Sequence, residues 1–195
     1  MKKLTLIRHG ESTANRDQIS QGQSDYELSE LGIVQAKKLA NRLKNHNFDI
    51  AYISDLKRAK QTAEEILTFH KIPTIYDKRL RERAIGNLEG KPRAKYLELK
   101  EYIETDFDGK GESYFQVQKR VKELLDEILC SDKKDILIVA HGGVIKVLLY
   151  TLFDLDLYTA FEERKFSTEN TCVYEIELND KEVKILTENC TLHLD

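Results

Sequence analysis

Two apolar segments of this chain each end in a histidine that is followed by glycine. The first segment ends in Arg8-His9-Gly10 and the second in His141-Gly142. If both segments are buried strands, their carboxyl ends lie where ligands bind in open α/β sheets. An arginine supplies a fixed cation for an anionic group, and a histidine supplies a neutral nitrogen nucleophile near physiological pH. Arg8 and His9 side by side therefore predict attack on a phosphoryl group, with His141 at the same edge.

A further cation and a proton donor stand elsewhere in the chain. Arg58 follows another strand-like run and falls near the first turn of a helix, for which Ser54 is a plausible N-cap. Helix N-termini favour anions through their N–H groups and dipole. Glu82 could donate a proton to a leaving oxygen. Glu89 is an equally acidic competitor, and a solvated charge cluster is the structural alternative for Glu82, so spacing alone does not choose between the two carboxyl groups.

The loop after His9 offers additional polar groups. Gly10 permits a sharp turn after the strand, and Asn15 could return a side-chain donor to the strand end. Gln21-Gly22 lies further along the same loop and could close over a ligand. We expect these groups to contribute to binding.

Strand-like and helix-like segments alternate and must position these residues. The alternation predicts a three-layer α/β/α sandwich with a mainly parallel sheet. A short polar link at 179–182 indicates a hairpin, and hence an antiparallel strand at one edge of the sheet. Residues 83–114 interrupt the alternation with several glycines and one helical stretch, 96–103, and we interpret them as a small helical cap insert in a single domain, 1–195. The expected strands are 4–8, 49–53, 74–76, 135–141, 172–178 and 183–188, and the expected helices are 31–46, 56–69, 115–129 and one starting at Gly143.

Composition narrows the function classes. The 195 residues carry a formal net charge of −3 and show no basic stripe, so we expect no nucleic-acid partner. The longest apolar runs are too short to span a bilayer, so we expect no membrane association. The three cysteines have no C-x-x-C spacing, which favours a reducing cytoplasm over a disulfide framework or a zinc site. No spacing of His, Asp or Glu indicates a metal site, and no cofactor is expected.

Four motifs occur in the order found in a known family, from residue 4 to about residue 145. Together they resemble the histidine phosphatase superfamily, in the branch that holds cofactor-dependent phosphoglycerate mutase and its phosphatase relatives. The motifs are Leu6-Ile7-Arg8-His9-Gly10-Glu11-Ser12; Ser54-x-Leu56-x-Arg58-Ala59-x-Gln61-Thr62-Ala63; Leu80-x-Glu82-x-x-x-Gly86-x-x-Glu89-Gly90; and Val139-Ala140-His141-Gly142-Gly143.

The resemblance implies a role for each matching residue. His9 matches the nucleophile, which is phosphorylated on a ring nitrogen, and Glu82 matches the proton donor. We expect the other ring nitrogen of His9 to donate to a backbone carbonyl near Gly10. Gln21 matches a loop position that contacts phosphate in some members, and the Gly142 amide is a further donor. The pocket for the phosphoryl oxygens is matched by Arg8, Arg58, Asn15 and His141.

The resemblance implies a phosphatase for a small phosphorylated metabolite. Broad-specificity and substrate-specific versions stay open. A phosphoglycerate mutase-type transfer is the alternative, although the insert is short and its basic candidates are Lys91, Arg93 and Lys95. A non-catalytic phospho-ligand binding module is a second alternative, and the complete set of site residues argues against it.

Two structural questions stay open at this stage. The edge hairpin could pair with a second copy in a homodimer, or the chain could stay monomeric. Aromatic residues of the insert could line a substrate pocket or pack the insert onto the sheet, and we favour packing. These aromatic residues are Tyr96, Tyr102, Phe107, Tyr114 and Phe115.

Overall fold

A six-stranded sheet forms the centre of the molecule. The computed structural model describes residues 1–92, 98–179 and 182–195. Strand β1 (Lys2–Arg8) lies inside the sheet, whose order is β3-β2-β4-β1-β5-β6. It pairs in parallel with β4 (Asp135–Ala140) and antiparallel with β5 (Val173–Leu178). The first four strands in this order are parallel, so their carboxyl ends share one edge of the sheet.

The remaining elements follow the predicted alternation. Strands β2 (Ile50–Ile53) and β3 (Thr74–Tyr76) complete the parallel part, and β6 (Val183–Cys190) forms the antiparallel edge with β5. Short 3₁₀ turns cover Lys78–Leu80, Gly86–Leu88 and Leu192–Leu194. The helices are α1 (Thr13–Arg16), α2 (Glu30–Leu43), α3 (Lys57–Leu67), α4 (Leu99–Glu104), α5 (Tyr114–Cys130), α6 (Gly142–Leu152) and α7 (Leu157–Glu162).

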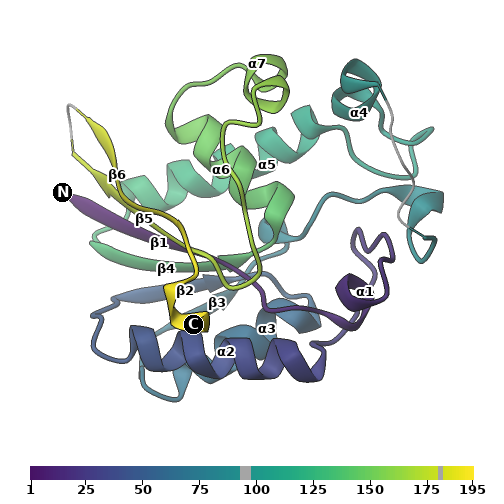
Figure 1. Cartoon of the computed structure of the whole chain (residues 1–195). Helices are drawn as coiled ribbons and strands as arrows, with labels where there is room; N and C mark the ends of the chain where they lie inside the picture. The colour runs from purple at the N-terminus through teal and green to yellow at the C-terminus, as the bar shows by residue number, and fades with distance from the viewer. Residues whose placement is uncertain (93–97, 180–181) are drawn as a thin grey trace.

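Helices cover both faces of the sheet (Figure 1). Helices α2 and α3 lie on one face, and α5, α6 and α7 lie on the other. Side chains of a strand point alternately to opposite faces. In β4, Ile136 and Ile138 therefore pack in the core beneath α5 and α6, whereas Leu137 and Val139 pack in the core beneath α2 and α3. The predicted three-layer α/β/α sandwich with an antiparallel edge is confirmed.

Helix α2 is rotated relative to the sequence-based expectation. Helical spacing predicts an apolar face made of Leu31, Val34, Leu39 and Leu43. Leu39 and Leu43 are buried, but Leu31 and Val34 are 53% and 50% exposed. Gly32 faces inward in their place, because a Cβ at this position would lie 1.9 Å from the carbonyl oxygen of Glu11. The glycine lets the first turn of α2 approach the backbone that follows β1, so α2 abuts the loop that carries the site.

The prediction that Ser54 caps α3 is wrong. Leu56 occupies the N-cap position without a side-chain cap hydrogen bond. Arg58 is nevertheless in the first turn of α3, as predicted. The short helices α1 and α7 were not predicted, because each is only 4 or 6 residues long and carries little periodicity.

The segment 83–114 extends beyond the carboxyl ends of the parallel strands. Its predicted helix over 96–103 is α4, and residues 93–97 lie outside the described residues. Two isolated bridges, Ile85 to Gly111 and Ile19 to Pro92, connect this segment to itself and to the loop after α1. In Figure 1, α1 and α4 lie at the same end of the molecule.

Candidate active site

The two histidines meet because their strands are neighbours. Arg8 of β1 lies opposite Ala140 of β4, and the His9 amide donates to the Ala140 carbonyl at 3.1 Å. The next residues along both strands, His9 and His141, therefore stand side by side with ring centroids 5.1 Å apart. Both side chains are buried. The predicted pairing of two strand-end histidines is present.

One ring nitrogen of His9 is held by the backbone. His9 Nδ1 lies 2.6 Å from the Gly10 carbonyl oxygen. A carbonyl only accepts, so Nδ1 carries the proton and Nε2 carries a lone pair. The turn at Gly10 is itself held by α3, because the Gly10 amide donates to Thr62 Oγ1 at 3.0 Å. The predicted backbone acceptor is therefore Gly10 itself.

The surroundings of His9 keep its ring neutral. Burial is the largest effect that lowers the pKa of His9, and the positive charges of Arg58 and Arg8 lower it further. The bond to Gly10 works in the opposite direction and is outweighed. A neutral imidazole with its lone pair on Nε2 is the form that can act as a nucleophile.

His141 has a different pair of partners. Arg58 Nε donates to His141 Nδ1 at 3.2 Å, so Nδ1 is the acceptor nitrogen. His141 Nε2 then carries the proton and donates to Ser54 Oγ at 2.7 Å. Burial lowers the pKa of His141, and the charge of Arg58 lowers it further. Ser54 thus orients His141 instead of capping α3.

Arg58 connects the histidine pair to the loop after α1. Its guanidinium is buried and donates to the carbonyl oxygens of Gly22 at 2.9 Å and of Ser24 at 2.8 Å. Burial lowers the pKa of Arg58 to about 10, so the group keeps its charge at neutral pH. A buried cation held by neutral carbonyls is suited to an incoming anion.

Arg8 provides a second cation that acts on His9. Its Nη1 donates to the Thr168 carbonyl at 2.6 Å, in the loop between α7 and β5. A Cβ on Gly142 would lie 3.5 Å from Arg8 Nε, so Arg8 runs alongside the first residue of α6. The predicted donor Gly142 is therefore beside Arg8, at the N-terminus of a helix of 11 residues.

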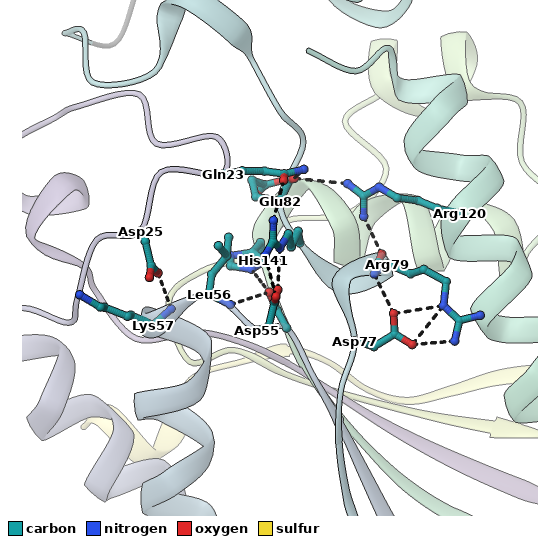
Figure 2. A network of polar contacts seen from close by, with 12 residues as sticks. Gln23, Asp25, Asp55, Leu56, Lys57, Asp77, Arg79, Glu82, Arg120 and His141 are labelled. Carbon is teal, nitrogen blue, oxygen red and sulfur yellow. Dashed lines mark hydrogen bonds and ion pairs between the residues drawn. The ribbon is translucent and has the colours of Figure 1, made fainter. Parts of the chain in front are cut away.

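Glu82 faces the same helix N-terminus. Its carboxylate accepts from the Gly143 amide at 3.1 Å and from the Arg83 amide at 2.9 Å. Arg120 donates to the backbone carbonyls of both Glu82 and Arg79, and Figure 2 shows it between them. Backbone amides and Arg120 therefore fix the position of Glu82 at the N-terminus of α6, whose N-cap residue is His141.

Glu89, the competing carboxylate, has a different position. It accepts from the Gln23 amide at 2.9 Å, the Ser24 hydroxyl at 2.7 Å and the Ile85 amide at 3.3 Å. These contacts join the loop after α1 to the segment 83–114. The structure therefore places Glu82 beside α6 and assigns Glu89 to the joint between two loops.

The remaining predicted binding residues cluster around Ser12. Asn15 Oδ1 accepts from the Ser12 amide and hydroxyl, as part of the capping box of α1. Gln21 Oε1 accepts from the same hydroxyl at 2.8 Å. Gly22 is buried with a φ of 50°, and a Cβ there would lie 2.2 Å from Glu89 Oε1. The loop therefore requires glycine at position 22, because a side chain there would displace Glu89.

Arg83 joins distant parts of the segment 83–114 to one another. Its guanidinium donates to the carbonyl oxygens of Glu112, Tyr102 and Thr105 and lies 4.4 Å from the centroid of the Tyr114 ring. Tyr102 and Tyr114 also pack against Phe161 of α7. Phe107 lies under Arg83, and Phe115 packs against Tyr158. Tyr96 lies outside the described residues. The other insert aromatics pack against Arg83 and α7, and Tyr102 and Phe115 are still 39% and 44% exposed.

Sequence reasoning missed three positioning groups: the hydroxyls of Ser54 and Thr62 and the carbonyl of Thr168. Ser54 and Thr62 belong to the motif around Arg58, so the motif marked both positions but did not predict which groups their hydroxyls bind. Thr168 had no signal, because only its backbone is used. Over the described ranges, no helix is long and apolar enough to cross a membrane, and no three His, Cys, Asp or Glu residues could together hold a metal ion.

The fold and the site define a class of protein. A parallel sheet delivers two buried neutral histidines, two arginines and a helix-bound carboxylate to one edge, which is an arrangement for phosphoryl transfer. A family model described as histidine phosphatase superfamily (branch 1) matches residues 4–191. The chain belongs to the histidine phosphatase superfamily.

Individual relatives agree with this assignment. A metal-independent phosphoserine phosphatase of Arabidopsis thaliana is 34% identical over 158 residues, 75% of this chain and 66% of that protein. A mutant phosphoserine phosphatase of Entamoeba histolytica, solved with phosphoserine, is 31% identical with a TM-score of 0.82, covering 100% of both chains. A mycobacterial glucosyl-3-phosphoglycerate phosphatase, solved with VO3, is 27% identical with a TM-score of 0.84, covering 97% of this chain and 100% of that one.

Proposed function

We propose that this chain hydrolyses small phosphomonoesters through a phosphohistidine formed on His9, with Glu82 as the proton donor. The observation that carries the proposal is the neutral His9, whose Nδ1 is bonded to the Gly10 carbonyl and whose Nε2 is the acceptor nitrogen. Arg8 and Arg58, whose charges both act on His9, neutralise the phosphoryl oxygens. This is the work of a phosphoric monoester hydrolase of the histidine acid phosphatase type.

In the first step, His9 Nε2 attacks phosphorus and the ester P–O bond breaks. Glu82, in its protonated form, gives its proton to the leaving alkoxide, so an alcohol departs and Glu82 becomes a carboxylate. Preorganised cations lower the energy of the charge that develops on the equatorial oxygens. The Gly142 amide and the side-chain amides of Asn15 and Gln21 are further donors in this proposal.

In the second step, water attacks the phosphohistidine. The Glu82 carboxylate accepts a proton from this water, the P–N bond breaks, and His9 recovers its lone pair on Nε2. The bonds of Glu82 to the amides of Gly143 and Arg83 hold it in place through both steps. One carboxyl group thus serves as the acid and then as the base.

The phosphoserine and glucosyl-3-phosphoglycerate phosphatases among the relatives support a small phosphorylated metabolite as substrate. We place the protein in the cytoplasm as one domain, 1–195, with a cap insert at 83–114, and with no nucleic-acid or membrane partner. The three free cysteines, Cys130, Cys172 and Cys190, support a reducing compartment. The outer edge of β6 is where a homodimer would form.

Hydrolysis of p-nitrophenyl phosphate in the presence of EDTA, measured from about pH 5 to about pH 8, tests the proposal over the range in which histidines titrate. We expect turnover that EDTA does not reduce. Absence of turnover throughout would favour a phospho-ligand binding module. Conversion of 3-phosphoglycerate after priming with a 2,3-bisphosphate, without release of phosphate, would favour a mutase.

A further inference from the structure

Lys146 is a half-buried cation that the proposed reaction does not use. It lies one turn into α6, four residues after Gly142 and three after Gly143. Among the residues that the structure describes, its ammonium has no hydrogen bond and no ion pair within 4.0 Å. A lysine that gives up part of its hydration without a fixed partner costs stability, which calls for an explanation.

The glycines of α6 determine where this side chain runs. Long side chains of a helix point back towards its N-terminus and cover the preceding turn. In α6 the preceding turn is Gly142 and Gly143, which have no side chains to fill that surface. A Cβ on Gly143 would lie 2.5 Å from Glu82 Oε1, so the surface towards which a long side chain at position 146 is directed borders Glu82.

The charges around Lys146 agree with this position. Burial lowers the pKa of Lys146, the charges of Arg8 and Arg164 lower it further, and the charge of Glu82 raises it. Two cations, Arg8 and Arg164, and one carboxylate, Glu82, therefore act on Lys146, and the oxygens of that carboxylate already accept from two backbone amides. The cluster has an excess of positive charge.

Lys146 follows, one turn along α6, the Gly143 whose amide binds Glu82, the proposed proton donor to the leaving group. The cations that act on His9 are Arg58 and Arg8, which in the proposed reaction neutralise the transferred phosphoryl group. Lys146 instead feels Glu82 and Arg164 in addition to Arg8. Glu82 protonates the leaving oxygen in the proposed reaction, so the alcohol part of the substrate lies next to Glu82, within reach of a cation beyond it.

We propose that Lys146, assisted by Arg164, binds a second anionic group on the alcohol part of the substrate. The preferred substrates are then phosphomonoesters whose leaving alcohol also carries a carboxylate or a phosphate. This inference rests on the proposed function and deepens it, because it names the chemistry that distinguishes good substrates from poor ones.

Matched pairs of esters test this inference. 3-Phosphoglycerate and glycerol 3-phosphate share a primary leaving oxygen and differ by the carboxylate, and fructose 1,6-bisphosphate and fructose 6-phosphate differ by the second phosphate. The kcat/KM ratio of each pair is measured for the wild type and for Lys146→Met, Lys146→Arg and Lys122→Met. Lys122 is an exposed lysine of α5 that lines a groove with Thr151 and Leu152 at the C-terminal end of α6, and it serves as the matched control.

We expect the wild type to prefer at least one anionic ester, and Lys146→Met to lower that ratio by roughly 10- to 100-fold, as for loss of a charge-assisted hydrogen bond. Lys146→Arg should recover part of the ratio, and Lys122→Met should keep it. Equal losses on both members of a pair in Lys146→Met would overturn the inference, as would a wild type that prefers neither anionic ester. Hydrolysis in those cases would leave the proposed function intact, whereas absence of hydrolysis of all esters, p-nitrophenyl phosphate included, would refute both.

Discussion

Substitution of Gly143 by alanine tests the position of Glu82 without touching its carboxyl group. The new Cβ would lie 2.5 Å from Glu82 Oε1 and 3.2 Å from the Tyr114 hydroxyl. Ordinary contact begins at 3.4 Å, so the carboxylate must retreat by about 0.9 Å. Its bond to the Gly143 amide, 3.1 Å long, would then be lost. The fold should survive, because alanine favours a helix over glycine by about 1 kcal/mol.

A displacement of about 1 Å in a catalytic group can cost about 10²-fold in rate. We therefore expect Gly143→Ala to lower kcat for an alkyl phosphate by roughly 10²-fold. The loss on p-nitrophenyl phosphate should be less than about tenfold, because its leaving group needs little protonation. The assay is steady-state release of phosphate from both esters.

Glu82→Gln provides the reference for this experiment. The two substitutions act on the same group, so the double variant should lose little more than Glu82→Gln alone. Equal losses on both esters in Gly143→Ala would refute the account of Glu82 as the acid, and so would additive losses in the double variant.

Three further predictions concern stability and the loop joint. The pKa values of the buried histidines His9 and His141 are lowered, so below about pH 6.5 the folded state binds fewer protons than the unfolded chain. The free energy of unfolding from urea titrations should therefore fall as the pH drops below about 6.5, by up to about 1.4 kcal/mol per pH unit for each histidine. A flat profile between about pH 6.5 and about pH 5 would contradict this sign. Arg83→Met removes the donor from three carbonyls and should lower the free energy of unfolding by about 2 kcal/mol or more in denaturant titrations. An unchanged midpoint would show that the internal structure of the segment 83–114 depends on other contacts. Glu89→Ala removes the acceptor that holds the loop after α1, so KM for p-nitrophenyl phosphate should rise by roughly tenfold, as for loss of about one net hydrogen bond, while kcat changes little. A kcat loss as large as that of Glu82→Gln would reverse the roles given to the two carboxylates.

The sequence predicted the parts of the fold and site that depend on strands. Strand β4 is a continuous apolar run that ends in histidine, and its neighbour β1 ends in the same way, so the meeting of His9 and His141 followed from parallel pairing. The inward face of α5 was also correct, because Val117, Val121 and Leu124 repeat at helical spacing and are all buried.

Contacts made by backbone or by short helices were beyond sequence reasoning. The rotation of α2 depends on the close approach of Gly32 to Glu11, which no apolar period reports. The choice between Glu82 and Glu89 depends on which loop each carboxylate reaches, and spacing does not carry that information. Ser54 illustrates a local rule overridden by tertiary structure, because its hydroxyl binds His141, while the first amide of α3, that of Lys57, donates to Asp25.

The central claim is that His9 Nε2 carries the phosphoryl group between substrate and water. The direct measurement is rapid quenching during turnover at alkaline pH, where phosphohistidine survives, followed by peptide mass spectrometry of the wild type and of Glu82→Gln. We expect one phosphoryl group on the peptide that contains His9, and no label on that peptide in His9→Ala. Turnover in His9→Ala, or a phosphoryl group found on His141 instead, would contradict the account.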